Sequence, residues 1–76
     1  MNADDWVRRY AAELGIEAPS EEEQHTLLEL AGTAARASER TAAPISCWVA
    51  ARAGFGAKAA LAAAEKLARD LGIPAD

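Results

Sequence analysis

Residues 20–38 read SEEEQHTLLELAGTAARAS. Ser20 followed three residues later by Glu23 is the pattern of a capping box, which starts a helix by satisfying two of its free N–H groups. Behind this start, apolar residues recur at the spacing of one helical face. They are Leu27, Leu30, Ala31 and Ala34, with Leu28 and Ala35 at the edge. The stretch predicts a long helix over 20–38 that turns one face to a core.

Three more helices are expected around this one, over residues 4–14, 44–53 and 57–71. No segment shows the alternation of apolar and polar residues that is typical of a strand. A chain of 76 residues has room for one core only. We therefore expect an all-α fold, a compact four-helix bundle, in a single domain over residues 1–76.

Glycine and proline mark the predicted helix ends. Leu14-Gly15-Ile16 and Leu71-Gly72-Ile73 share one ending, in which the glycine turns left-handed and the isoleucine folds back. Pro44 suits the first turn of the third helix, where its missing N–H is no loss. Thr41 or Ala43 is then the residue that caps this helix.

The first, third and fourth predicted helices each carry an apolar stripe as well. The residues expected to face the core are Trp6, Val7, Tyr10, Ala11 and Leu14 in the first, Ile45, Trp48, Val49 and Ala53 in the third, and Leu61, Ala64, Leu67, Ala68 and Leu71 in the fourth. However, 21 of the 76 residues are alanine, and burying an alanine gains little free energy. A partner, a dimer or a covalently attached neighbour is therefore expected to support the domain.

The charge is spread unevenly along the chain. The net charge is −4, which argues against a general nucleic-acid binder. The middle third is nevertheless basic, because Arg36, Arg40, Arg52 and Lys58 outnumber the single acid Glu39. No signal peptide and no membrane-spanning segment are apparent, so we expect a cytoplasmic protein with no membrane partner.

The sequence offers no catalytic constellation. Ser38 and Ser46 have no histidine near them to act as a base, and Ser20 is engaged as a cap. His25 lies among glutamates at a helix start, an arrangement that is more often a solvated surface than a metal site. Cys47 stands alone and is expected to pack. We expect no enzyme activity, no metal and no cofactor.

Two turns in the basic segment could receive an anion or an acidic partner. Thr41–Pro44 and Gly54–Gly56 both precede helices, whose free N–H groups attract anions. The candidate residues for interaction or anion binding are Arg36, Arg40, Thr41, Pro44, Arg52, Phe55 and Lys58. The simpler interpretation is ordinary helix ends with solvated arginines. Phe55, in a glycine turn, is the aromatic expected to be exposed as an anchor, whereas Trp48 is expected in the core.

Four short motifs carry a family resemblance: Asp5-Trp6, Leu14-Gly15-Ile16, Leu27–Ala31 and Glu39–Pro44. Over residues 4–56 the chain resembles a small actinobacterial domain family of unknown function. That family is found alone or attached to molybdenum cofactor guanylyltransferase, the enzyme that joins GMP to molybdopterin. The stretch from Arg40 to Pro44 before an apolar helix is the most specific part of the likeness.

The chain departs from the family pattern in two places. The family often has His-x-x-x-Arg-Pro-Ala-Ala-Pro across this loop, but here Arg36 and Thr41 stand for the histidine and the first proline. Its next helix usually carries Phe-Leu, where this chain has Cys47-Trp48-Val49. A histidine-dependent role is therefore not carried over. The resemblance implies an accessory role near molybdopterin guanine dinucleotide synthesis, without the transferase chemistry itself.

Two hypotheses follow from the sequence. The first is a non-catalytic module that binds a protein, a guanylyltransferase or a molybdoenzyme, around Arg36, Arg40, Pro44 and Phe55; self-association is the alternative to such a partner. The second is a domain that binds a small anion, a nucleotide or a pterin phosphate over the same basic segment. A ligand that raises the melting temperature in a salt-dependent way would favour the second.

Overall fold

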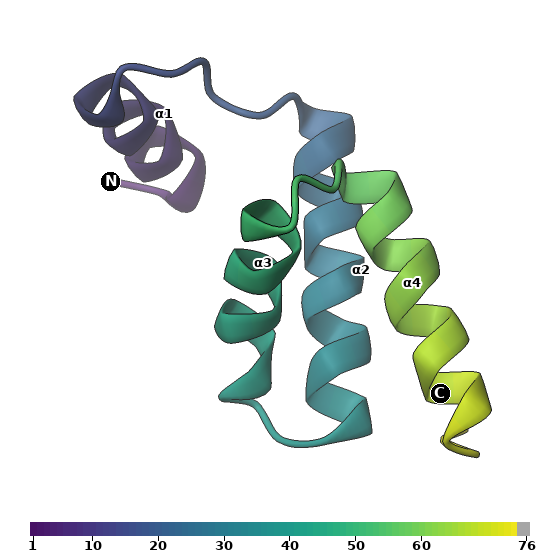
Figure 1. Cartoon of the computed structure of the whole chain (residues 1–76). Helices are drawn as coiled ribbons and strands as arrows, with labels where there is room; N and C mark the ends of the chain where they lie inside the picture. The colour runs from purple at the N-terminus through teal and green to yellow at the C-terminus, as the bar shows by residue number, and fades with distance from the viewer. Residues whose placement is uncertain (75–76) are drawn as a thin grey trace.

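Four helices make up the computed structural model, which describes residues 1–74 (Figure 1). They are α1 (Ala3–Leu14), α2 (Glu21–Ala37), α3 (Ala42–Arg52) and α4 (Ala57–Asp70). The predicted all-α four-helix bundle is confirmed. Each observed helix end lies within two residues of the expected one.

Helix α2 is the element on which the others are built. Helices α3 and α4 flank it and both pack against it, and α4 runs in the same direction as α2 (Figure 1). Helix α1 lies to one side and is joined to α2 by an extended segment. It is tied to α2 by Gln24, whose Nε2 donates a hydrogen bond of 3.4 Å to Oδ1 of Asp4.

The predicted start of α2 is confirmed in detail. Glu23 N donates to Ser20 Oγ at 3.1 Å, and Ser20 N donates to Glu23 Oε1 at 2.9 Å. These two bonds are the capping box. Helix α3, in contrast, begins after Thr41, whose side chain makes no capping hydrogen bond.

The shared Leu-Gly-Ile ending has the same geometry in α1 and α4. Gly15 and Gly72 have φ angles of 76° and 75°, in the left-handed region that glycine enters without steric cost. After each glycine the chain folds back, so that Ile16 N donates to Ala11 O at 3.0 Å and Ile73 N donates to Ala68 O at 2.9 Å. The predicted stop signal is therefore confirmed at both helices.

The core is small. Within residues 1–74, Leu30 of α2 is the largest buried side chain, with 3% of its surface exposed, and Ala11 and Ala60 are the other buried apolar residues. Thr26 is buried as well, and its hydroxyl donates to Glu22 O at 3.0 Å, so it leaves no unpaired donor. No side chain among residues 1–74 is fully enclosed.

The predicted inner face of α3 is wrong. Ile45, Trp48, Val49 and Ala53 are exposed, Trp48 by 64%. The half-buried stripe is instead made of the small residues Ala43, Ser46, Cys47 and Ala50, which also have helical spacing. Small side chains allow the α3 backbone to approach α2 closely, and this close packing leaves the larger apolar side chains on the outside.

In α1 and α4 the predicted inner face is wrong only in part. In α1, Ala11 is buried and Val7 half-buried as expected, but Trp6, Tyr10 and Leu14 are exposed. In α4, the expected inner residues Leu61, Ala64 and Ala68 are half-buried, whereas Leu67 and Leu71 are exposed. These large side chains stay exposed because α1 and α4 each pack along one narrow stripe.

The molecule consequently has a large surface for its mass. It exposes 5,919 Å², whereas a folded monomer of 8.0 kDa exposes roughly 4,450 Å². Its radius of gyration is 13.1 Å, against about 11.4 Å for a compact domain of this length. Both measures show a molecule less compact than an ordinary domain of its size, and its exposed large apolar side chains include Trp6, Trp48 and Leu67.

We expect Ser20→Ala to lower the free energy of unfolding by about 1 kcal/mol, because the capping box loses its acceptor for Glu23 N. Urea denaturation followed by circular dichroism measures the change. Ser38→Ala is the matched control, since Ser38 caps the end of α2 through its backbone N–H. Equal losses in both variants would show that the capping box does not stabilise α2.

We expect Trp48→Gln to change the free energy of unfolding by less than about 0.5 kcal/mol, because its side chain is exposed. Leu30→Ala should cost about 2–4 kcal/mol in the same urea titration, since Leu30 is the main buried side chain. A cost at Trp48 that approaches the cost at Leu30 would place Trp48 in the core and contradict this structure.

Candidate interaction surfaces

An apolar groove runs between α3 and α4, with Leu30 of α2 among its lining residues. It has a volume of about 320 Å³. The groove arises because α3 and α4 each pack on α2 through small residues and make little contact with one another. Its lining consists of Leu30, Ile45, Ser46, Val49, Ala50, Ala53, Phe55, Ala60, Ala63, Ala64 and Leu67.

The groove is lined unevenly. Ile45 and Val49 of α3, Phe55 of the following turn and Leu67 of α4 are its large side chains, and all four are exposed. The rest of the two helical walls is alanine with one serine. The groove is therefore a hollow with apolar rims, of the kind that receives bulky side chains from another helix.

A second surface is the outer face of α3. Thr41, Pro44, Trp48 and Arg52 follow one another at spacings of three or four residues, so they lie along one side of this helix, and all four are exposed. We call this set the α3 face. Tryptophan and arginine are the residues that most often dominate the energy of protein interfaces. The α3 face thus combines three predicted site residues with a tryptophan that the sequence analysis placed in the core.

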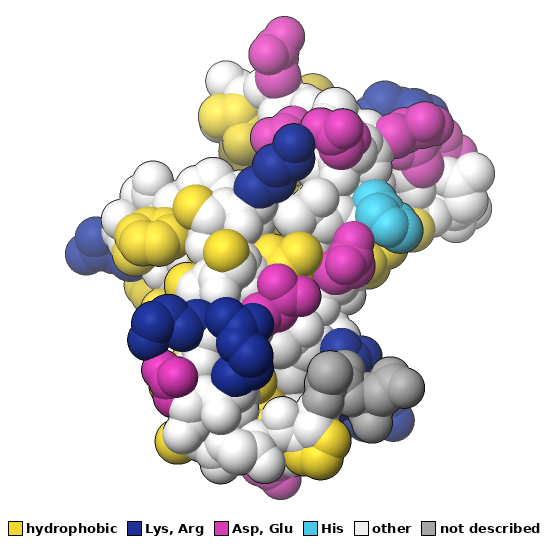
Figure 2. Space-filling model, turned by 90° about the vertical axis from the view of Figure 1, so that its right-hand side faces the viewer, with side chains coloured by type: hydrophobic (Ala, Val, Ile, Leu, Met, Phe, Trp, Pro, Cys, Tyr) yellow, Lys and Arg dark blue, Asp and Glu magenta, His cyan; other side chains and the backbone are white. Residues whose placement is uncertain are grey.

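The predicted basic segment does not form one continuous patch. Arg36 and Arg40 lie near the α2–α3 loop, whereas Phe55 and Lys58 lie near the α3–α4 turn, at the opposite end of the helices (Figure 1). Helix α3, with 11 residues, separates the two ends by about 16 Å. The side of the molecule shown in Figure 2 carries both acidic and basic side chains, and acidic ones lie next to the basic ones.

Lys58 has an acidic neighbour in space. Its Nζ lies 3.8 Å from Glu22 Oε1, and both side chains are highly exposed. An exposed pair of this kind contributes little to stability. It does, however, place a carboxylate beside the one predicted anion-binding residue of α4, which disfavours an anion at that end.

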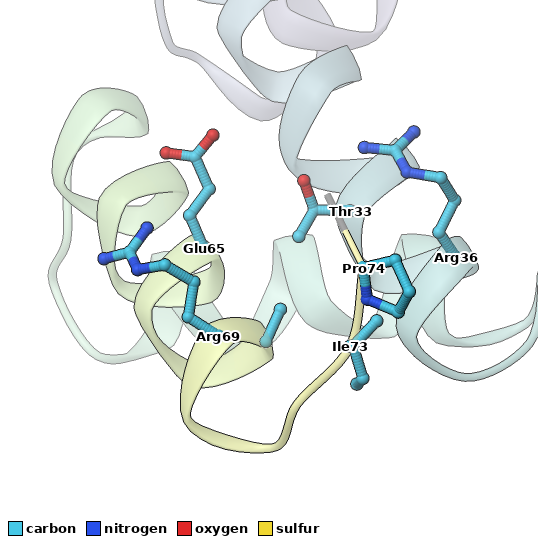
Figure 3. Close-up of a pocket in the computed structure, with 7 residues that line it drawn as sticks. Thr33, Arg36, Glu65, Arg69, Ile73 and Pro74 are labelled. Carbon is cyan, nitrogen blue, oxygen red and sulfur yellow. The ribbon is translucent and has the colours of Figure 1, made fainter. Parts of the chain in front are cut away.

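A pocket of about 210 Å³ lies between α2 and α4 near their C-terminal ends. Figure 3 shows Thr33 and Arg36 coming from α2, Glu65 and Arg69 from α4, and Ile73 and Pro74 from the segment after α4; Ala68 completes the lining. The two guanidinium groups lie on opposite sides of the pocket in this view. Sequence analysis missed Arg69, because nothing local in the sequence shows that α2 and α4 run in the same direction.

The positions of these two arginines at helix C-termini have a structural explanation that does not involve a ligand. Arg36 and Arg69 are the basic residues in the last turns of α2 and α4. The carbonyl ends of the two parallel helices carry partial negative charge, which favours arginine there and disfavours an added anion. Gly32 also leaves room for Arg36, whose Nη1 would lie 3.1 Å from a Cβ at position 32.

Among the described residues, the remaining polar groups form no cluster with metal-binding geometry. His25 Nε2 lies 3.3 Å from Glu29 Oε1, and both side chains are exposed. No group of three histidine, cysteine, aspartate or glutamate residues within 1–74 is arranged to hold a metal ion. Over the same range, none of the helices has the length and apolarity needed to cross a lipid bilayer.

Comparison with known proteins places the chain in a family without giving it a function. Neither a curated protein nor a solved structure matches the chain. One family model, "Domain of unknown function (DUF6457)", matches residues 1–75. Because the match covers nearly the whole sequence, the chain belongs to this family of domains of unknown function.

Proposed function

We propose that the chain is a non-catalytic protein-interaction module and that it docks a partner on the α3 face. The observation that carries this proposal is the exposure of Trp48, 64% of which faces solvent on a helix whose small residues pack inward. An exposed tryptophan stabilises the fold little. It is well suited to fill a pocket on another protein, where one such side chain contributes a large share of the binding energy.

The surroundings of Trp48 fit a protein partner better than a small ligand. The residues of the α3 face line neither the apolar groove nor the pocket between α2 and α4, and Arg40 and Arg52 lie toward the two ends of this face. A central tryptophan with arginines at the margin is typical of an interface, in which the rim remains polar. Acidic groups on the partner would complement these arginines and speed association.

The proposed setting is molybdopterin guanine dinucleotide synthesis in the cytoplasm. Support comes from the resemblance of Arg40–Pro44 to the domain that accompanies molybdenum cofactor guanylyltransferase. Thr41 and Pro44 of this motif are exposed and lie on the α3 face itself. The partner proposed for this face is therefore a guanylyltransferase or a molybdoenzyme that receives the finished cofactor.

We expect Trp48→Ala to weaken binding to purified molybdenum cofactor guanylyltransferase by at least about 30-fold, the effect of losing a hot-spot side chain. Isothermal titration calorimetry measures the affinity. Leu28→Ala is the control, since Leu28 is an exposed apolar residue of α2 outside the α3 face. Absence of binding by the unmodified chain, or equal weakening by both variants, would refute docking of the transferase on the α3 face.

A second candidate function is binding of a small anion, such as a phosphate, a nucleotide or a pterin phosphate, between α2 and α4. The observation that favours it is the pocket that brings Arg36 and Arg69 to one hollow together with Thr33. The carbonyl ends of the two helices oppose it. Protein docking therefore remains the better supported function.

For the anion candidate we expect phosphate, GMP, GTP or molybdate to raise the melting temperature, by an amount that falls as salt is added. The shift should disappear in Arg36→Ala and in Arg69→Ala, which lose one cation of the pocket. It should persist in Arg9→Ala, whose exposed side chain lies on α1. No shift with any of the four ligands would exclude this candidate.

A further inference from the structure

We propose that the groove between α3 and α4 is filled by helix α1 of a second copy of this chain, and that the exchange is reciprocal. The outcome is a dimer with twofold symmetry in which each chain gives one helix and receives one. The inference goes beyond the proposed function, because it concerns the groove and α1 and leaves the α3 face free.

Helix α1 carries an apolar face that its own chain does not cover. Trp6 and Tyr10 stack with ring centroids 5.8 Å apart and planes inclined by 9°, yet they remain 59% and 52% exposed. Leu14 continues the same side of the helix and is exposed too. The helix is held to its own chain along the adjacent side, through buried Ala11 and the bond from Gln24 to Asp4.

The groove has the shape that this face requires. Ala60, Ala63 and Ala64 of α4, Ala50 of α3 and Ala53 directly after α3 leave it hollow. A stacked tryptophan and tyrosine are the bulky counterpart, and large side chains that enter an alanine-lined hollow give close packing between helices. The lengths agree as well, since Trp6 to Leu14 and Ala60 to Leu67 span about 12 Å and about 10 Å along their helices.

The exposed area is large enough to supply a contact between two copies of the chain. The surface exceeds that of a compact monomer of the same mass by about 1,500 Å² per chain, which corresponds to about 3,000 Å² for two chains. Obligate homodimers bury about 2,000–5,000 Å² in total. A reciprocal exchange also covers both unpartnered surfaces, the α1 face and the groove, with one contact made twice, as twofold symmetry requires.

Sedimentation equilibrium of the full chain tests the dimer. We expect twice the chain mass of 8.0 kDa at micromolar concentration. Ala63→Arg places a charge in the groove and should raise the dissociation constant at least 100-fold, whereas Ala62→Arg on the neighbouring exposed position outside the groove should not. Tyr10→Arg should weaken the dimer likewise, and Ala12→Arg should not. Circular dichroism verifies that each variant keeps its helices.

Cross-linking between chains tests which elements meet. In a Cys47→Ser background, chains with Tyr10→Cys are mixed with chains with Ala63→Cys and treated with a short bismaleimide. We expect a cross-linked pair of chains in high yield, and at least tenfold less when Ala62→Cys replaces Ala63→Cys. Because each chain then carries one thiol, a product between the two variants can only join α1 of one copy to α4 of another.

A monomer at all concentrations up to millimolar would overturn the inference, and so would a dimer that Ala63→Arg leaves intact. Equal cross-linking from positions 62 and 63 would overturn the placement of α1 in the groove. The proposed function is tested separately by Trp48→Ala, which should leave the dimer intact. A monomer that loses the transferase through Trp48→Ala would refute the dimer alone, and a dimer that ignores the transferase would refute the docking alone.

Discussion

The close approach of α3 and α4 to α2 through small side chains is the constraint from which the rest of the structure follows. Ala43, Ser46 and Ala50 on α3, and Ala60 and Ala64 on α4, bring these helices against α2 without filling the space between them. With Leu30 as the largest buried side chain, little apolar surface is withdrawn from water. The chain thus orders its helices by close backbone approach more than by burial of bulk.

The local features of the fold were predictable because they depend on neighbouring residues alone. Ser20 with Glu23 determines where α2 begins, and Gly15 and Gly72 determine where α1 and α4 end, each through hydrogen bonds within a few residues. Such signals work the same way in any tertiary setting. This is why four helices with nearly correct bounds follow from the sequence.

The packing of α3 was not predictable in this way, because the helix carries two competing stripes. Ile45, Trp48 and Val49 make the more apolar one, and hydrophobic periodicity selects it as the inner face. The actual inner face is formed by Ala43, Ser46, Cys47 and Ala50. Which of the two stripes faces inward depends on the side chains of α2 that lie opposite. Because alanine side chains are small, the alanine-rich stripe allows the two helix backbones to pack closely. The same limit applies to the basic segment, whose residues are near one another in sequence but lie at two ends of α3.

The sequence indicated some of the residues that line the candidate surfaces. These are Phe55, which the structure places in the groove, Arg36, which it places in the pocket, and Thr41, Pro44 and Arg52, which it places on the α3 face. The sequence could not indicate Ala63, Leu67 or Arg69, because their importance comes from which helix lies beside α4. Trp48 shows the general difficulty. A tryptophan at the spacing of an apolar helical face is usually interior. Only the packing of the neighbouring small residues reveals that Trp48 is exposed and available to contact a partner.

The segment between Gly15 and Ser20 bears on how the helices unfold locally. It separates two helices that each have their own start and stop, since Asn2 caps α1 and Ser20 caps α2. Little joins them beyond the bond from Gln24 to Asp4 and the burial of Ala11. In the language of hydrogen exchange, we expect α1 of a single chain to open as a foldon of its own at a lower free energy than α2, α3 and α4, which exchange their amide protons together as a more protected unit.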